Sequence, residues 1–340
     1  MANLKTKYMG LELKNPVIVG ASNLTLDVDN LKRMEDAGAA AIVCKSLFEE
    51  QVQLENLEIY EQKTEYEERN AEMVTLFPKV NSDSGSLAGH LNHLRNAKEA
   101  VNIPVFASLN AVSDEVWVEY ATQIEETGVD GIELNFYTLP EKLEKEYEDI
   151  EARQIKILKN VKSAVRIPVS VKLSSFYTNP LKVITGLDQN GASAVVLFNK
   201  LFQPDIDIEG EKHLFPYNLS KREDNRLPMR FAGLLHGKMV ASLCTNSGIF
   251  NGKDVVKMIL AGSDCVQIVS TLYLNKIEVI ASILLEIEGW MDSKGYDSID
   301  SFKGKLSLNN SVNKLPYHRA QYIDFMMTTS EIIKKYRVIN

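Results

Sequence analysis

The chain has 340 residues, of which 45% are hydrophobic and 25% charged, with 46 acidic against 38 basic side chains and a formal net charge of −8. This globular composition, without any basic block, argues against a nucleic-acid groove or an anionic membrane surface as the main partner, because both select clustered Lys and Arg. The length admits one or two domains, since an α/β barrel commonly needs about 250 residues for a single core.

Eight short apolar runs recur along the chain, and each is predicted to be a β-strand. In the first six, a Pro that can begin a strand alternates with a Gly that closes the preceding helix. In chain order the predicted strands are 15–19, 40–43, 103–106, 131–134, 167–171, 194–197, 238–243 and 265–268. Helix-like segments separate them, at 31–37, 115–126, 150–164, 181–190, 252–260 and 274–291.

Strands that are apolar throughout indicate a parallel sheet covered on both faces. Eight strand–helix units favour an α/β fold of the (β/α)8 TIM-barrel type, with long βα-loop insertions and a C-terminal helical tail. An open, doubly wound sheet is the alternative, but Gly20-Ala21-Ser22-Asn23 after the first strand lacks the dinucleotide fingerprint. We expect a barrel over residues 1–294 and a tail over 295–340 that packs on the barrel or on a partner.

The cysteines and the N-terminus indicate the compartment. Cys44, Cys244 and Cys265 lie in or beside apolar runs, without disulfide or metal-ligand spacing, and are interpreted as buried thiols. The N-terminal residues lack the apolar core of a signal peptide, and no run approaches the roughly 20 apolar residues of a membrane span. We therefore expect a cytoplasmic protein that contacts no membrane and no nucleic acid.

Polar residues at the carboxyl ends of the strands are the candidate site residues, because barrel enzymes build their sites there. They are amides, hydroxyls and two lysines, Lys45 and Lys172, which suit a planar hydrogen-bonding ligand with a phosphate better than a metal. Lys172 lies within an apolar strand, so either an anion faces it or its ammonium reaches solvent. The segments 245–249 and 269–271 follow the last two strands, where barrels commonly bind phosphate.

The five histidines show no zinc spacing, and we predict no metal site. His90 and His93 are predicted to lie on a solvated helical face.

These residues resemble the FMN-containing dihydroorotate dehydrogenase family, in particular a bacterial dihydroorotate dehydrogenase-like branch. The resemblance covers about residues 5–305, and its motifs are 10–17, Lys45-Ser46, Asn81-Ser82, Glu133-Leu134-Asn135, 171–173 and 261–271. It implies an FMN cofactor, whose binding residues would be Ala21, Ser22, Lys45, Ser46, Asn110, Asn135, Lys172, Gly233, Gly248, Ser270 and Thr271. The substrate-binding residues would be Lys45, Asn81, Asn135 and Asn199.

The resemblance also implies a reaction in pyrimidine biosynthesis. A base removes a proton from dihydroorotate, or from a related small dihydropyrimidine or carboxylate, while hydride passes to flavin N5 and orotate forms. The catalytic positions would be Thr138 and Lys45. Thr138 stands where the family has Cys or Ser, and Pro140 stands where it has a substrate-binding Asn. Lys45 and Lys172 are expected to make the site locally positive for a small anionic substrate.

Two departures keep other functions open. Thr138 and Pro140 also fit a non-catalytic flavin- or ligand-binding barrel that serves as a subunit. A flavoenzyme like a tRNA-dihydrouridine synthase would share the FMN barrel, but the acidic net charge of the chain fits it poorly. The chain has no iron–sulfur cysteine cluster. We therefore expect electrons to pass to a soluble oxidant or to a separate acceptor protein, and the chain to form a homodimer.

Overall fold

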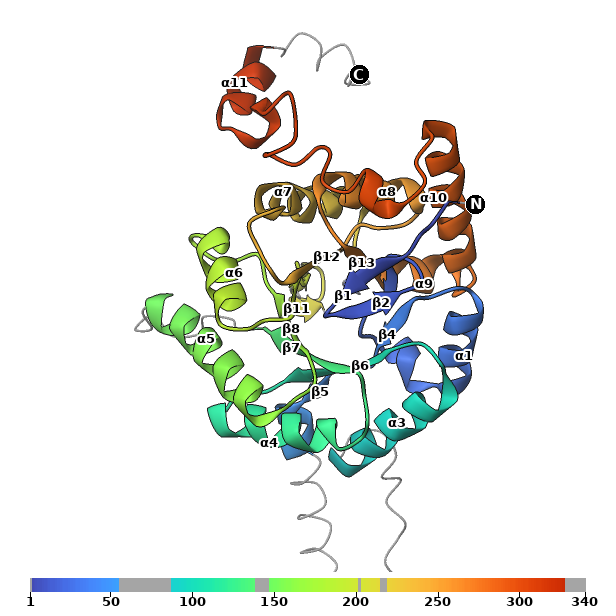
Figure 1. The fold of residues 1–340 in the computed structure, drawn as a ribbon. Helices are drawn as coiled ribbons and strands as arrows, with labels where there is room; N and C mark the ends of the chain where they lie inside the picture. The colour runs from blue at the N-terminus through green and yellow to red at the C-terminus, as the bar shows by residue number, and fades with distance from the viewer. Residues whose placement is uncertain (1, 55–86, 138–146, 201–202, 215–218, 328–340) are drawn as a thin grey trace, which may run out of the picture.

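A closed barrel of eight parallel strands forms the core, and helices surround it (Figure 1). This computed structural model describes residues 2–54, 87–137, 147–200, 203–214 and 219–327. The barrel strands are β3 (Val17–Val19), β4 (Ala41–Val43), β6 (Val105–Asn110), β7 (Gly131–Phe136), β8 (Val169–Leu173), β9 (Ala194–Leu197), β12 (Ser242–Asn246) and β13 (Cys265–Ile268). Each pairs with the next, and β13 pairs with β3, so the predicted (β/α)8 barrel is confirmed.

The helices cover the outside of the barrel and bury an apolar stripe against it (Figure 1). They are α1 (Val28–Asp36), α3 (Leu87–Ala100), α4 (Asp114–Glu125), α5 (Tyr147–Ala164), α6 (Pro180–Gln189), α7 (Arg226–Leu235), α8 (Gly252–Ala261), α9 (Ser270–Asn275) and α10 (Val279–Lys294). A further helix, α11 (Ala320–Met327), lies in the tail. Local sequence sets their ends: the Asn179 and Asn251 side chains cap α6 and α8, and α10 ends at the left-handed Gly295. No helix among the described ranges has both the length and the apolarity to cross a bilayer.

The predicted position of the seventh strand is wrong. The strand is Ser242–Asn246, so it begins four residues later than the apolar run 238–243 indicates. Val240 is 99% exposed, and the backbone N–H groups of Val240 and Ala241 donate to the carboxylate of Asp188. Because Asp188 holds this stretch as a loop, its apolar residues do not enter the sheet.

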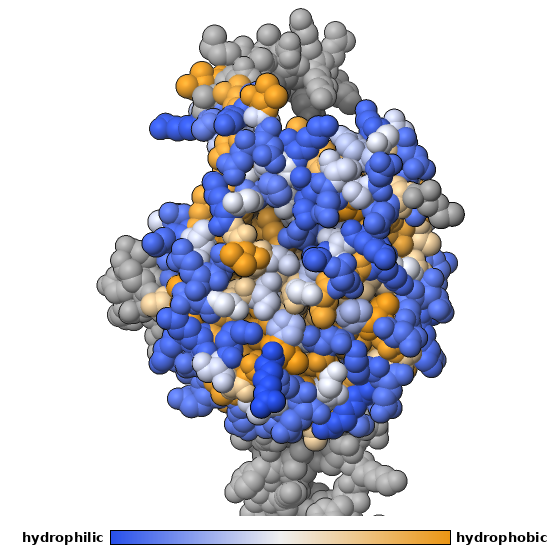
Figure 2. Space-filling view, in the orientation of Figure 1, coloured by the Kyte–Doolittle hydropathy of each residue, from blue (hydrophilic) through white to orange (hydrophobic). Residues whose placement is uncertain are grey.

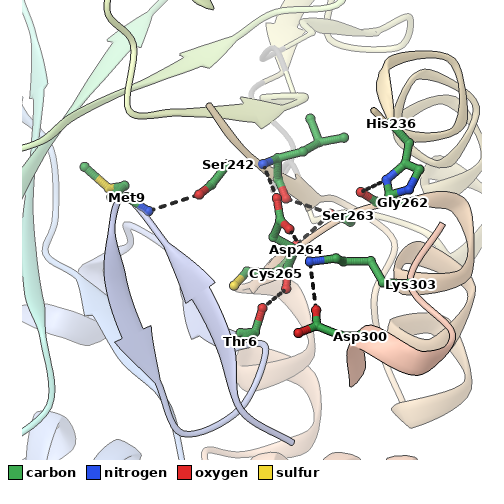
Figure 3. Close-up of polar contacts among 11 residues, drawn as sticks. Thr6, Met9, His236, Ser242, Gly262, Ser263, Asp264, Cys265, Asp300 and Lys303 are labelled. Atoms are coloured by element: carbon green, nitrogen blue, oxygen red, sulfur yellow. Dashed lines mark hydrogen bonds and ion pairs between the residues drawn. The ribbon is translucent and has the colours of Figure 1, made fainter. Parts of the chain in front are cut away.

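A hairpin of β1 (Thr6–Tyr8) and β2 (Leu11–Leu13) packs against the amino end of the barrel. The Thr6 hydroxyl donates to the Asp264 carbonyl at 3.0 Å (Figure 3). The Asp264 carboxylate accepts from the Leu243 N–H at 2.7 Å and from Lys303 Nζ at 3.0 Å. This one residue therefore joins the hairpin, β12 and the segment after α10, at the end of the barrel opposite the candidate site.

The segment after α10 packs on the barrel helices. Phe302 is 1% exposed and contacts the rings of Trp290 and Tyr296. Further along, the Tyr317 hydroxyl donates to the Leu306 carbonyl, and Arg230 of α7 donates to the carbonyls of Pro316 and Tyr317. Beyond Tyr317, α11 extends away from the barrel with Ile323 and Met326 exposed (Figures 1 and 2).

Four further short elements lie in the connections of the barrel. β5 (Leu47–Phe48) pairs with β6, and β10 (Asp205–Asp207) pairs with β11 (Lys212–Leu214) in a hairpin after β9. The 3-10 helix η2 (Arg222–Asn225) precedes α7. The hairpin and η2 lie between β9 and α7, in a long βα connection of the kind that the sequence predicts.

Candidate functional site

A cavity of about 140 Å³ lies at the carboxyl ends of the barrel strands. It is lined by Ala21, Lys172, Asn199, Lys200, Ser220, 246–249 and 267–270. Five of the predicted ligand-binding residues are therefore together at one cavity: Ala21, Lys172, Asn199, Gly248 and Ser270.

Lys172 is buried in the barrel interior and has two partners there. Its Nζ lies 3.1 Å from Gln267 Oε1 and 3.5 Å from Glu133 Oε1. Gln267 Nε2 donates to Glu133 Oε2 at 2.5 Å, so the three side chains form a closed triad. Lys172 and Gln267 line the cavity, whereas Glu133 is 1% exposed and is not among the lining residues. The alternative in which Lys172 reaches solvent is wrong, because a carboxylate of the same chain faces it.

A pair of amides lies next to this triad. Asn199 Nδ2 donates to Asn135 Oδ1 at 2.9 Å, which links the end of β9 to β7. This bond uses one hydrogen of Asn199 and the carbonyl oxygen of Asn135. The Asn135 amide nitrogen and the Asn199 oxygen retain capacity to donate to and accept from a ligand.

The loop after β12 forms the opposite end of the cavity. Ser247 and Gly248 both have positive φ, of 70° and 69°, a backbone conformation that can turn N–H groups toward an anion. A Cβ at Gly248 would lie 2.5 Å from the Asn225 nitrogen, so η2 can approach only a glycine here. The Ser220 N–H and hydroxyl both lie 2.9 Å from Ser270 Oγ, which brings loop 219–225 against the start of α9.

Lys200, at this same end, also has a carboxylate partner. Its Nζ lies 2.8 Å from Asp224 Oδ2. Burial disfavours ionisation of Asp224, but the hydrogen bonds from Lys200 and from the Lys221 backbone outweigh it and lower the pKa of this carboxyl. Asp224 is therefore an anion that offsets the charge of Lys200.

Several buried polar atoms at the site lack a hydrogen-bond partner among the described residues. They are Ser22 Oγ, Glu133 Oε1 and Asn246 Oδ1. Leaving such an atom unpaired costs about 1–3 kcal/mol, so a polar ligand that bonds Asn246, which of the three residues is the one that lines the cavity, would relieve part of the cost. Lys172 Nζ adds to this, because it makes one hydrogen bond in the described part and an ammonium has three N–H groups.

The remaining predicted residues that the structure describes, Ser22 and Asn135 among them, lie outside the lining set. Ser46 and Ser108 share a buried hydrogen bond of 2.7 Å, Lys45 donates its N–H to Thr25, and Asn110 ends β6 with 7% exposure. Thr271 donates to the Phe250 carbonyl. Gly233 lies in α7, where a Cβ would clash with the Tyr317 hydroxyl, so this glycine accommodates the tail. Asn81, Thr138 and Pro140 lie outside the described residues.

The prediction for His90 is wrong. It is 5% exposed, and its pKa is lowered to about 4, first by burial and then by His93 and Lys45. His93 is partly exposed, and burial lowers its pKa too. α3 turns this face inward, toward the end of β4, instead of toward solvent.

Four residues of the site were not predicted from the sequence: Glu133, Gln267, Lys200 and Ser220. A signal for Glu133 was present, since Glu133 and Asn135 are two residues apart in a buried strand and so share the interior face. In the described part of the chain, no group of three His, Cys, Asp or Glu side chains could hold a metal ion.

Comparison with family models finds that residues 3–291 match the family described as dihydroorotate dehydrogenase. The catalytic subunit of dihydroorotate dehydrogenase B (NAD(+)) from Thermoplasma volcanium is 25% identical over 310 residues, covering 89% of this chain and 98% of the relative. The subunit of the same name from Caldicellulosiruptor saccharolyticus is 24% identical over 319 residues, covering 90% and 100%. A dihydroorotate dehydrogenase A (fumarate) from Lactobacillus helveticus is 24% identical over 214 residues, covering 61% and 69%.

Proposed function

Because the chain belongs to the dihydroorotate dehydrogenase family, we propose that it is an FMN-dependent oxidoreductase of pyrimidine biosynthesis that oxidises dihydroorotate to orotate. A related small dihydropyrimidine or carboxylate is the alternative substrate. The observation that carries the proposal is the cavity in which Lys172, Asn199, Gly248 and Ser270 meet at the carboxyl ends of the strands.

The residues of the cavity fit FMN in charge and in hydrogen-bonding capacity. Lys172 has N–H groups to donate to an electron-rich ring edge, and Ala21 offers little bulk beside it. Asn246, which lines the cavity, and Ser22, next in the chain to the lining residue Ala21, each carry a buried oxygen that lacks a partner in the described chain. The positive-φ backbone at Gly248 and the Ser270 hydroxyl would hold the phosphate. When bound, the flavin supplies an acceptor for hydride, which no protein side chain can provide.

The chain's own residues would position the substrate and its protons. Asn135 and Asn199 already orient one another, so their remaining amide groups would hydrogen-bond a planar cyclic imide or carboxylate. Lys45, at the end of β4, would stabilise negative charge on the substrate. Thr138 would relay the substrate proton to a water molecule, its hydroxyl accepting one proton as it gives up its own, although this hydroxyl is hindered at the branched carbon and less acidic than a thiol.

The purified protein provides the test. A flavin absorbance spectrum that bleaches under anaerobic dihydroorotate supports the proposal, and Thr138→Cys should accelerate the bleaching. If the protein is yellow but dihydroorotate bleaches neither the wild type nor Thr138→Cys, dihydroorotate is rejected as the substrate while the flavin-binding assignment stands. In that case the alternative of a non-catalytic flavin-binding subunit gains. A colourless protein that binds no added FMN rejects both.

The electron acceptor can be assigned in the same preparation. We propose that electrons leave to a separate acceptor protein or to a soluble oxidant, since relatives are named as catalytic subunits of NAD(+) enzymes and one is named for fumarate. Reoxidation of the reduced protein by NAD+ or by fumarate alone would identify a soluble oxidant. Failure of both would indicate a partner protein, and sedimentation would test the proposed homodimer.

A further inference from the structure

We propose that Glu133 is a positioning residue that sets the charge of Lys172 and thereby lowers the reduction potential of the bound flavin. This inference rests on the proposed flavin-binding function. It concerns a residue beneath the cavity that is not among the residues lining it.

The triad places a carboxylate directly against the lysine of the cavity. Glu133 Oε1 lies 3.5 Å from Lys172 Nζ, and Gln267 holds both residues, accepting from Lys172 and donating to Glu133. The Lys172 and Glu133 side chains are 8% and 1% exposed. Water and salt therefore screen this pair weakly, and the field of Glu133 extends to whatever Lys172 contacts.

The three residues come from strands on opposite sides of the barrel. Glu133 and Lys172 lie on β7 and β8, whereas Gln267 lies on β13, beside β3. Gly20 packs closely beside this crossing, since a Cβ there would lie 2.8 Å from Val269 Cγ2 and 3.3 Å from Gln267 Oε1. The triad is thus fixed by the barrel itself, so its geometry should persist when a ligand enters.

A flavin ring gains negative charge when it is reduced at neutral pH, so a nearby cation favours the reduced form and raises the reduction potential. A carboxylate paired with that cation opposes this effect. Since Glu133 leaves the pair nearly neutral, Lys172 can donate hydrogen bonds to the ring without strongly favouring its reduced form.

The experiment is to measure the midpoint potential of FMN bound to the full chain and to Glu133→Gln. Gln keeps the shape and the acceptor for Gln267 but removes the charge. We expect the ratio of the affinities for reduced and oxidised flavin to rise at least tenfold, which is about 30 mV for a two-electron couple. Adding Lys172→Met to Glu133→Gln should abolish this rise.

Asp224→Asn is the matched control. It also removes the carboxylate partner of a cavity lysine, but the Lys200 and Asp224 side chains are 33% and 34% exposed, so solvent should screen the change and leave the potential unaltered. If Glu133→Gln does not fold, Glu133→Asp, which withdraws the carboxylate by one methylene, should raise the potential by a smaller amount.

Each outcome decides the inference. An unchanged or lowered potential in Glu133→Gln or Glu133→Asp overturns it, as does an equal rise in Asp224→Asn. These results would leave the proposed function intact, because FMN would still be bound. A chain that binds no FMN rejects the proposed function and this inference together.

Discussion

The buried pair of Glu133 and Lys172 should dominate the stability of the site. At 3.5 Å and an effective dielectric constant of about 20, the attraction between the charges is about 5 kcal/mol. Desolvation offsets much of it, yet removing one partner of a buried pair costs about 3–5 kcal/mol because the other charge stays buried. A substitution of either residue alone should therefore lower the free energy of unfolding by far more than the intact pair contributes to it.

The two single variants should lose different amounts of unfolding free energy. Lys172→Met leaves Glu133 at 1% exposure and away from the cavity, so we expect the full cost of about 3–5 kcal/mol in the free energy of unfolding. Glu133→Gln leaves Lys172 at the cavity wall, where water can solvate it, so we expect about 2 kcal/mol. The double variant should lose at least about 2 kcal/mol less than the sum of the singles.

Urea unfolding at pH 7, followed by circular dichroism with matched refolding curves, would measure these differences. Glu12→Gln is the control, because its partner Lys7 and Glu12 itself have side chains 75% and 65% exposed and such pairs contribute at most about 1 kcal/mol. Single variants that cost no more than this control, or a double variant that costs the full sum, would refute the reasoning.

Three further predictions concern the loop after β12, the buried histidine and the tail. Gly248 has a φ of 69°, and a Cβ added there would lie 2.5 Å from the Asn225 nitrogen. Gly248→Ala should therefore lower the affinity for FMN at least tenfold, as measured by flavin fluorescence during titration. Burial lowers the pKa of His90 in the folded protein to about 4, so as the pH falls the unfolded chain protonates this histidine before the folded protein does. The wild-type protein should therefore lose about 3 kcal/mol of unfolding free energy between pH 6.5 and 4 through His90. His90→Gln should lack this part of the loss in urea unfolding at each pH. Gly233→Ala, whose added Cβ would clash with the Tyr317 hydroxyl, should release the tail to limited trypsin digestion and leave the FMN content unchanged.

Matched variants separate these effects from general damage. Gly128 has φ 82° and no atom within 4 Å of the position that a Cβ would take, and Gly289 is a helical glycine with the same open space. Gly128→Ala should keep FMN affinity, and Gly289→Ala should keep the tail protected. His213 is exposed, so His213→Gln should lose as much unfolding free energy between pH 6.5 and 4 as the wild type does. Flavin loss from Gly233→Ala with an intact tail would support the resemblance-based assignment of this residue to FMN.

The barrel could be predicted because its strands are buried on both faces and thus appear as continuous apolar runs. The same criterion misplaced the seventh strand, since Met239 and Val240 are apolar but the Asp188 carboxylate holds the adjoining backbone N–H groups in a loop. Apolar character alone does not distinguish a strand from a loop that a distant carboxylate binds. For His90 the helical face was misjudged, because periodicity does not say which side of α3 faces the barrel.

The strand-end residues of the site followed from the rule that barrel sites lie at the carboxyl ends. The triad could not follow from it, because Glu133 and Gln267 are 134 positions apart and Lys172 and Gln267 are 95 apart. Their contact depends on which strands oppose each other across the closed barrel. Only the three-dimensional register supplies that information.

Pairing of both cavity lysines changes how the site should bind an anionic ligand. We expected Lys45 and Lys172 to make the site positive, but Glu133 offsets Lys172 and Asp224 offsets Lys200. Since two of the positive charges at the cavity are compensated, the backbone N–H groups at Ser247 and Gly248 and the Ser270 hydroxyl must hold more of a bound phosphate. Such fixed dipoles bind oxidised and reduced flavin almost equally, because the phosphate charge does not change on reduction. The affinity for the cofactor and its reduction potential can then be set by separate residues, the loop after β12 for the first and the Glu133–Gln267–Lys172 triad for the second.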